Sequence, residues 1–364
     1  MAWRRGALWV GGTLVALALG GLLFAASGIY NVAARSGHFD VTTWVIELVL
    51  RRSVALHARS AEAPNLDDID RIRLGAAHFQ GGCAPCHGAP GTARNPIVKG
   101  MLPVPPDLAR AAETWSEKEL FWIVRNGLKY TGMPAWSAPT REDEVWSVVA
   151  FLRRLPTMDT AGYRALAEGE AEPAVAQRAG WSPELLRCGR CHDTSDRPSA
   201  SQLVPRLAGQ SARYFAAALR AYKDEWRPSG IMQPIAAELD EAAIDRLAEQ
   251  YARLPGLVGT APTALADDLS QGRSIATAGV PEAGIPACLS CHASGYGLYP
   301  RLIGQSAAYI RQQLHLFQAG QREQTVLGQI MTPVARRLND RQIQEVADFL
   351  ASSGREPPGG DLSP

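Results

Sequence analysis

The sequence contains six cysteines, and all of them belong to three copies of the pentapeptide Cys-x-x-Cys-His. One helical turn would bring both thiols of a copy to the same side, with the imidazole directly after them. Thiols at this spacing can form thioethers with the two vinyl groups of a haem, and the imidazole can bind its iron. We therefore predict three covalently bound c-type haems. Their expected attachment residues are Cys83, Cys86, Cys188, Cys191, Cys288 and Cys291.

Structural zinc and disulfide bonds are the alternatives for such cysteine pairs. Zinc would join the pairs two by two and leave one of the three pairs unused. Disulfide bonds would not require a histidine immediately after every pair. Because no cysteine lies outside the pattern, haem is the preferred interpretation.

Each motif is followed by a methionine that predicts the second axial ligand of the iron. Met133 lies in Gly-Met-Pro, Met232 in Ile-Met-Gln-Pro and Met331 in Ile-Met-Thr-Pro, at 46, 40 and 39 residues after the motif histidine. A thioether at this position closes the iron and raises its reduction potential, which suits electron transfer. Met101 and Met158 compete for these roles. The expected iron ligands are His87, Met133, His192, Met232, His292 and Met331.

Four histidines lie outside the motifs, and none of them occupies a place that repeats from copy to copy. Any of the four could replace a methionine as distal ligand, but isolated histidines more often pack or lie at the surface. We therefore assign packing or surface roles to His38, His57, His78 and His315.

The N-terminal segment predicts a membrane anchor. Residues 6–34 carry no charged side chain, and residues 7–30 would form a helix of about 36 Å, long enough for a hydrocarbon core of about 30 Å. Arg4 and Arg5 precede it, so we expect a single-pass protein of a bacterial inner membrane, with its N-terminus in the cytoplasm and its haem domains in the periplasm. A cleaved signal peptide with a small-residue site at residues 25–27 is the alternative.

A second apolar stretch follows, from Phe39 to Leu56. It mixes aromatic and aliphatic residues with the paired Arg51 and Arg52, as an amphipathic helix does. Two locations are open for it. It can lie at the membrane surface or against a partner's transmembrane helices, or it can pack on the first haem domain.

The organisation of the rest follows from repetition. Successive motifs are 105 and 100 residues apart, which indicates three small domains. Residues 205–212 recur almost unchanged as residues 300–307, so one domain is a duplicate of another. Helical periodicity without alternating strand patterns predicts an all-α fold. The expected helix caps include Ser116, Thr140, Ser211, Asp240 and Ser306. The expected segments are an anchor at 1–34, an amphipathic connection at 35–66, haem domains at 67–158, 177–256 and 269–352, linkers at 159–176 and 257–268, and a disordered tail at 353–364.

These motifs resemble the class I cytochromes c, in which Cys-x-x-Cys-His opens a domain, Pro-x-Leu follows, and a methionine precedes the last helix. Residues 180–352 are especially similar to the two-domain dihaem cytochromes c of bacterial periplasms, since they contain Pro-x-Leu-x-Gly-Gln and Met-x-Pro. Residues 67–158 resemble the single-haem domains attached to respiratory complexes. The anchor and residues 28–59 resemble membrane-bound cytochromes c associated with haem-copper oxidases.

The resemblance implies three tandem class I cytochrome c domains, each helical and each with one exposed haem edge. It also implies that a backbone carbonyl orients each ligand histidine. The candidates are those of Pro106, Pro205 and Pro300. Asp193 and Ala293 depart from the family, which usually has glycine after the haem histidine, and the segment before Cys188 lacks a clear N-terminal helix.

The expected function follows from two features: each iron has an axial ligand on both faces, and a single chain anchored in the membrane carries all three haems. We expect an electron relay that accepts electrons from a quinol-oxidising complex or a soluble cytochrome and passes them to a haem-copper terminal oxidase. The alternative is the electron-accepting cytochrome subunit of a periplasmic dehydrogenase. A haem enzyme is disfavoured, because three methionines close the irons and no spare cysteine exists, so catalysis by this chain alone is not expected. The net charge of +1 with interleaved signs does not suggest a nucleic-acid partner.

Overall fold

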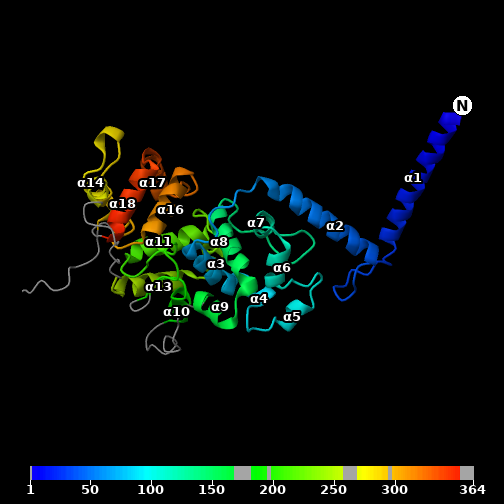
Figure 1. Ribbon diagram of the computed structural model, residues 1–364, viewed down its shortest axis with the longest axis horizontal. Coiled ribbons are helices and arrows are strands. Elements are labelled where there is room, and N and C mark those ends of the chain that lie inside the picture. The colour runs from blue at the N-terminus through cyan, green and yellow to red at the C-terminus, as the bar shows by residue number, and fades with distance from the viewer. Residues whose placement is uncertain (1, 168–181, 195–197, 257–268, 294–296, 353–364) are drawn as a thin grey trace, which may run out of the picture.

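The computed structural model describes residues 2–167, 182–194, 198–256, 269–293 and 297–352. These residues form helices joined by turns, with two isolated bridges, at Ala89–Thr92 and Val280–Ile285, and no strand within the described ranges. The expected all-α fold is therefore confirmed. Three helical domains follow two N-terminal helices that extend away from them (Figure 1). The second linker (257–268) and the tail (353–364) lie outside the described residues.

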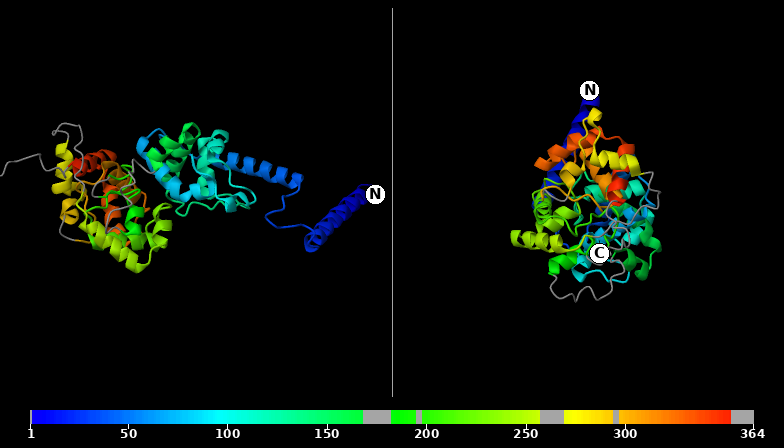
Figure 2. Two further views of the ribbon diagram at one scale, coloured as in Figure 1. Left: turned by 90° about the horizontal axis from the view of Figure 1, so that it is seen from below. Right: turned by 90° about the vertical axis from the view of Figure 1, so that its left-hand side faces the viewer.

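Two helices precede the first domain (Figure 2). Helix α1 (Ala2–Ala26) is long and apolar enough to cross a membrane, and none of its membrane-length window is buried in the protein. Helix α2 (Asp40–His57) is exposed over its first half but packs on the first domain at its end, where Val54 is fully buried. There the Arg51 guanidinium lies 5.4 Å from the ring centre of Trp115. Packing on the first domain is thus confirmed for the end of α2.

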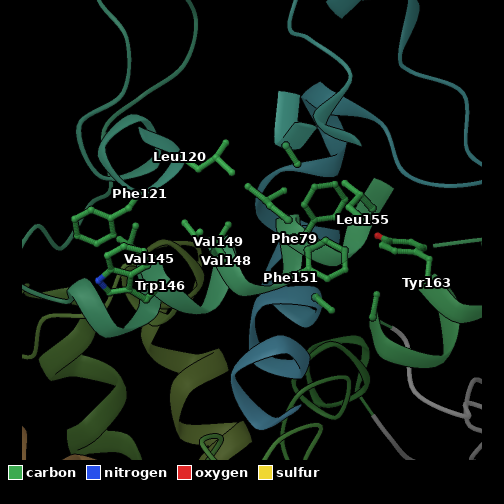
Figure 3. Packing of buried hydrophobic residues seen from close by; sticks show 14 residues of the cluster. Phe79, Leu120, Phe121, Val145, Trp146, Val148, Val149, Phe151, Leu155 and Tyr163 are labelled. Atoms are coloured by element: carbon green, nitrogen blue, oxygen red, sulfur yellow. The ribbon is translucent and has the colours of Figure 1, made fainter. Parts of the chain in front are cut away.

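The first domain is built on α3 and α8, which cross at its centre. Phe79 and Phe151 lie 5.0 Å apart between ring centres, and Phe121 stacks on Trp146 at 4.2 Å. Figure 3 shows these two aromatic groups at opposite ends of one core. The helices are α3 (Ile69–Gly82), α4 (Ala84–His87), α5 (Pro96–Lys99), α6 (Leu108–Thr114), α7 (Glu117–Asn126), α8 (Glu142–Arg154) and α9 (Thr160–Ala167), with short 3-10 turns η1 (Ala58–Ser60) and η2 (Leu155–Thr157).

The core of the first domain extends past residue 158, into the segment that the sequence assigned to a linker. Helix α9 (Thr160–Ala167) packs against α3, and Tyr163 is 2% exposed. The Tyr163 ring lies 6.0 Å from that of Phe79, and its hydroxyl donates to the side chain of Gln80. Helix α9 has only about two turns and one aromatic residue, so it is too short to be recognised from helical periodicity in the sequence.

The second and third domains repeat one order of helices. The second contains α10 (Pro183–Cys188), α11 (Ala212–Lys223), α12 (Met232–Ala237) and α13 (Glu241–Arg253). The third contains α14 (Ser270–Thr277), the turn η5 (Pro281–Ala283), α15 (Leu289–His292), α16 (Ala307–Gln318), α17 (Val326–Arg337) and α18 (Asp340–Ser352). The predicted caps Ser211, Asp240 and Ser306 accept backbone N–H bonds, and Ser116 forms the expected capping box. The prediction that Thr140 caps a helix is wrong, because α8 begins after Arg141.

The two copies of the repeated octapeptide face each other across the interface of the second and third domains. The Gln210 side chain accepts from the Arg301 N–H at 2.8 Å and donates to its carbonyl at 2.9 Å. Gln305 does the same with Arg206, at 2.9 and 3.1 Å. The duplication therefore produces a reciprocal, pseudo-twofold joint, in which each glutamine binds the backbone of the other copy.

Candidate functional site

All three Cys-x-x-Cys-His motifs adopt the same helical turn. In each, the histidine N–H donates to the carbonyl of the first cysteine, at 2.9 Å in the first motif and 3.0 Å in the second and third. In the first domain the turn is α4, which directly follows α3, and in the third it is α15. In the second it follows α10, which ends at Cys188. The turn presents two sulfurs and one imidazole in the order that haem attachment requires.

A proline carbonyl accepts a hydrogen bond from Nδ1 of each motif histidine, as the resemblance implies. The pairs are His87 with Pro106, His192 with Pro205 and His292 with Pro300, each 2.9 Å apart. Because a carbonyl only accepts, Nδ1 carries the proton and Nε2 keeps a free lone pair. Burial lowers the pKa of all three imidazoles below the ordinary value, so the neutral form that binds iron is favoured.

No disulfide bond joins any of the six cysteines, which lie in three separate domains. Burial raises the pKa of Cys83 to about 12, and those of Cys188 and Cys288 to about 11. An uncharged thioether sulfur suits these surroundings better than a thiolate does. Among the described residues, no group of three or more histidines, cysteines and acids converges as a metal site, so the structure does not assemble the paired zinc sites of the alternative.

The three candidate methionines precede the last long helix of their domains, which is α8 in the first, α13 in the second and α18 in the third. Met133 lies in an irregular segment after α7, Met232 is the first residue of α12, and Met331 lies within α17. All three are partly buried. Met101 stays a competitor in the first domain, because a Cβ built on Gly132 would lie 2.3 Å from its Cε. The Met101 and Met133 thioethers are thus carried by adjoining segments of the first domain.

The remaining histidines make packing or surface contacts. His57 stacks on Trp122 with 5.7 Å between ring centres, and His78 meets the edge of Trp136 at 4.9 Å. His38 Nδ1 lies 2.6 Å from the Tyr30 hydroxyl, and His315 Nδ1 lies 3.0 Å from Gln318 Oε1.

His78 gives the first domain a pH-dependent stability. Burial lowers its pKa from 6.5 to about 4, so between these values the unfolded chain binds a proton that the folded chain does not. Stability should therefore fall by about 3 kcal/mol as the pH drops from 7 to 4. Chemical denaturation of the full chain at both pH values measures this loss. His78→Phe, which keeps a ring against Trp136, should lack it, and an equal loss in the variant would contradict the assignment.

Asp193, a departure from the family pattern, has a structural role that the sequence did not reveal. Its side chain is fully buried, and Oδ1 accepts from the backbone N–H groups of Leu207 and Ala208. These residues follow Pro205, whose carbonyl orients His192. The carboxylate therefore fastens the acceptor loop to the haem motif. Burial raises the pKa of Asp193, while the two N–H groups oppose that shift.

Two arginines lie together between the second and third domains. Their surroundings show whether the protein has groups that suit the carboxylates of haem. Arg227 Nη2 donates to the Tyr309 hydroxyl at 2.9 Å, and Arg322 Nη1 donates to Gln313 Oε1 at 2.6 Å. The buried Nε of Arg322 has no partner, and burial beside Arg227 lowers the pKa of Arg322 to about 10. Neither arginine belongs to an ion pair within the described ranges. Such uncompensated buried charge fits a cofactor that carries carboxylates, as haem does.

Comparisons with known proteins agree with this geometry. The family model described as cytochrome c oxidase, cbb3-type, subunit III matches residues 70–152. The thiosulfate dehydrogenase electron acceptor of Thiomonas intermedia is 36% identical over 188 residues, which cover 50% of this chain and 86% of that protein. Cytochrome c4 of Thiocapsa roseopersicina is 34% identical over 200 residues, covering 52% of this chain and 97% of that protein.

A solved structure of cytochrome c4 from Acidithiobacillus ferrooxidans is also similar. It shares 37% sequence identity, with 45% of this chain and 97% of that chain covered, at a TM-score of 0.41.

Proposed function

Because this chain belongs to the cytochrome c family, and its last two domains to the two-domain dihaem type, we propose that it is a membrane-anchored trihaem electron carrier. The observation that carries the proposal is the threefold recurrence of one arrangement: two thiols on a helical turn, and an imidazole held by a proline carbonyl. Each copy supplies covalent attachment and a proximal ligand for one haem.

The residues of each site have distinct tasks. The cysteines attach the porphyrin, so the cofactor stays bound in both redox states. The proline carbonyl holds the Nδ1 proton, which fixes the imidazole and directs Nε2 to the metal. Bound haem supplies an iron that gains and loses one electron. We propose Met133, Met232 and Met331 as the ligands that close the opposite face, so that small molecules are excluded and little rearranges during transfer.

Location follows from the N-terminal helix. We propose that α1 (Ala2–Ala26) stays in the inner membrane as a single span, with Arg4 and Arg5 on the cytoplasmic side and the three domains in the periplasm. Its apolar side chains are uncovered by the rest of the protein, which is what contact with lipid requires. A cleaved signal peptide remains the alternative, and the N-terminal sequence of the mature chain decides between the two.

We propose the electron-transfer partner from two sequence similarities, which favour different partners. The match of residues 70–152 to a subunit of a cbb3-type oxidase supports delivery of electrons to a haem-copper terminal oxidase. The likeness to thiosulfate dehydrogenase electron acceptors favours a second candidate, acceptance of electrons from a periplasmic dehydrogenase. The two candidates differ in the direction of electron transfer, because an oxidase would withdraw electrons from this chain and a dehydrogenase would supply them.

Isolation of the partner tests this proposal. The full chain, tagged at its C-terminus, is solubilised from membranes in mild detergent, and the proteins that stay bound are identified by mass spectrometry. Subunits of a haem-copper oxidase, with oxygen-dependent oxidation of the reduced chain, support the leading proposal. A bound dehydrogenase whose substrate reduces the chain, without an oxidase, overturns it in favour of the second candidate.

A further inference from the structure

The first domain docks on the second through a buried polar joint, defined here as Trp136, Arg141, Glu144, Ser229 and Gly230. Glu144 Oε1 accepts from the Ser229 hydroxyl, and its Oε2 accepts from the Gly230 N–H, both at 2.7 Å. Arg141 Nη1 lies 3.0 Å from Glu144 Oε1 and donates to the Pro228 carbonyl at 3.0 Å. Glu144 is 3% exposed and Ser229 is 2% exposed. The carboxylate of one domain thus satisfies two donors of the next.

The joint continues into the backbone of Met232. The Ser229 hydroxyl oxygen accepts from the N–H of Met232 at 3.0 Å and from that of Ile231 at 3.3 Å. A hydroxyl has one proton and two lone pairs. Since the proton points to Glu144, the lone pairs face these two N–H groups. Glu144 therefore fixes the orientation of the group that caps the start of α12, where Met232 stands.

The methionine segments of the first two domains also touch directly. A Cβ built on Gly230 would lie 2.0 Å from Nε1 of Trp136, so the indole occupies the space of a side chain there. Trp136 is three residues after Met133, and Gly230 is two residues before Met232. The indole Nε1 donates to Glu144 Oε2 at 3.4 Å. The joint therefore connects the segment after one candidate ligand to the segment before the other.

We propose that Glu144 is a positioning residue for Met232, so that the first domain holds in place the axial ligand of the second domain's haem. This rests on the proposed function, because it takes Met232 as an iron ligand. Leaving a buried carboxylate or its donors unpaired costs free energy. Correct docking and correct placement of the Met232 segment consequently stabilise each other.

Glu144→Gln in the full-length holoprotein tests the proposal. The amide offers one acceptor and places an NH2 donor against Ser229 or Gly230, which are donors themselves. Added imidazole competes with methionine for ferric iron, and the far-red band of methionine-bound ferric haem reports its displacement. We expect displacement at one haem to need about tenfold less imidazole, since a charged hydrogen bond is lost.

Glu142→Gln is the matched control. It removes a charge from the same helix, but Glu142 is half exposed and pairs with Arg125 of its own domain at 3.0 Å. This variant should titrate like the wild type. Ser229→Ala, which removes the hydroxyl with little loss of volume, should reproduce the Glu144→Gln shift. In a Met232→Ala background, Glu144→Gln should add no further change.

The outcomes separate this proposal from the function on which it rests. If the wild type lacks a far-red signal from the second haem, Met232 is not its ligand and the proposed ligand set fails. If the wild type has that signal but Glu144→Gln and Ser229→Ala both titrate like Glu142→Gln, the positioning role of Glu144 is overturned.

Discussion

Replacing Met232 or Met331 by alanine is expected to open one iron, lower the reduction potential of that haem by on the order of 0.1 V, and allow it to bind carbon monoxide. A thioether ligand would stabilise ferrous iron and exclude small molecules from it, so its removal should change both properties together. A redox titration and a carbon monoxide titration of the reduced protein measure them. Neither variant should lose covalent haem, because attachment depends on the cysteines.

Met158→Ala is the control for this prediction, because Met158 packs against the core of the first domain. It should leave all potentials unchanged. Unaltered potentials and no carbon monoxide binding in Met232→Ala or Met331→Ala would show that these residues are not ligands.

In the first domain, Met133→Ala should open the iron and Met101→Ala should not. The reverse result would move the ligand to Met101, whose methyl group adjoins Gly132.

Gly75→Ala and Gly272→Ala are each expected to destabilise their domain by about 3 kcal/mol or more. A Cβ at Gly75 would lie 2.0 Å from the carbonyl oxygen of Ser147, and one at Gly272 would lie 2.0 Å from that of Glu345. Both clashes are with the backbone of the crossing helix, so α3 and α8, or α14 and α18, would have to separate. Denaturant unfolding of the holoprotein measures the loss.

Gly81→Ala serves as the control, since it lies in the same helix as Gly75 but its Cβ would meet nothing within 4 Å. Alanine there should stabilise the helix slightly, by about 0.5–1 kcal/mol. If Gly75→Ala and Gly272→Ala unfold at the same denaturant concentration as the wild type, the close helix crossing described above is wrong.

Local chemistry made much of this architecture predictable. The helix starts at Ser116, Ser211 and Asp240 follow from side-chain capping, which depends on residues within one turn. The histidine turns likewise follow from the motif itself. Thr140 does not cap α8. The residue before the helix, Arg141, binds Asp143 and the Pro228 carbonyl of the neighbouring domain. The local sequence does not indicate the contact with the neighbouring domain.

The contacts between domains were not predictable, because they join residues that are about 85 or more positions apart. The octapeptide repeat revealed a duplication but not that Gln210 and Gln305 bind each other's loops. Glu144 and Arg141 stand at a helix start rich in charge, a pattern typical of a solvated surface. Their partners in the second domain explain their burial: Ser229 and Gly230 donate to Glu144, and the Pro228 carbonyl accepts from Arg141.

The same division applies to function. The motifs indicate what each domain binds, because haem attachment is a matter of a few neighbouring residues. They do not indicate which protein supplies or takes the electrons, since docking surfaces are assembled from distant segments. The likenesses to oxidase subunits and to dehydrogenase electron acceptors accordingly agree on cytochrome c chemistry and differ on the partner.

The number of thioether-linked haems per chain tests the central claim most directly. Intact-mass measurement of the purified protein, with pyridine haemochrome absorbance as a second count, should give three covalently bound haems, one for each pair among the six cysteines. A mass that corresponds to two haems or fewer in fully matured protein, or cysteine pairs recovered as disulfides, would contradict the account.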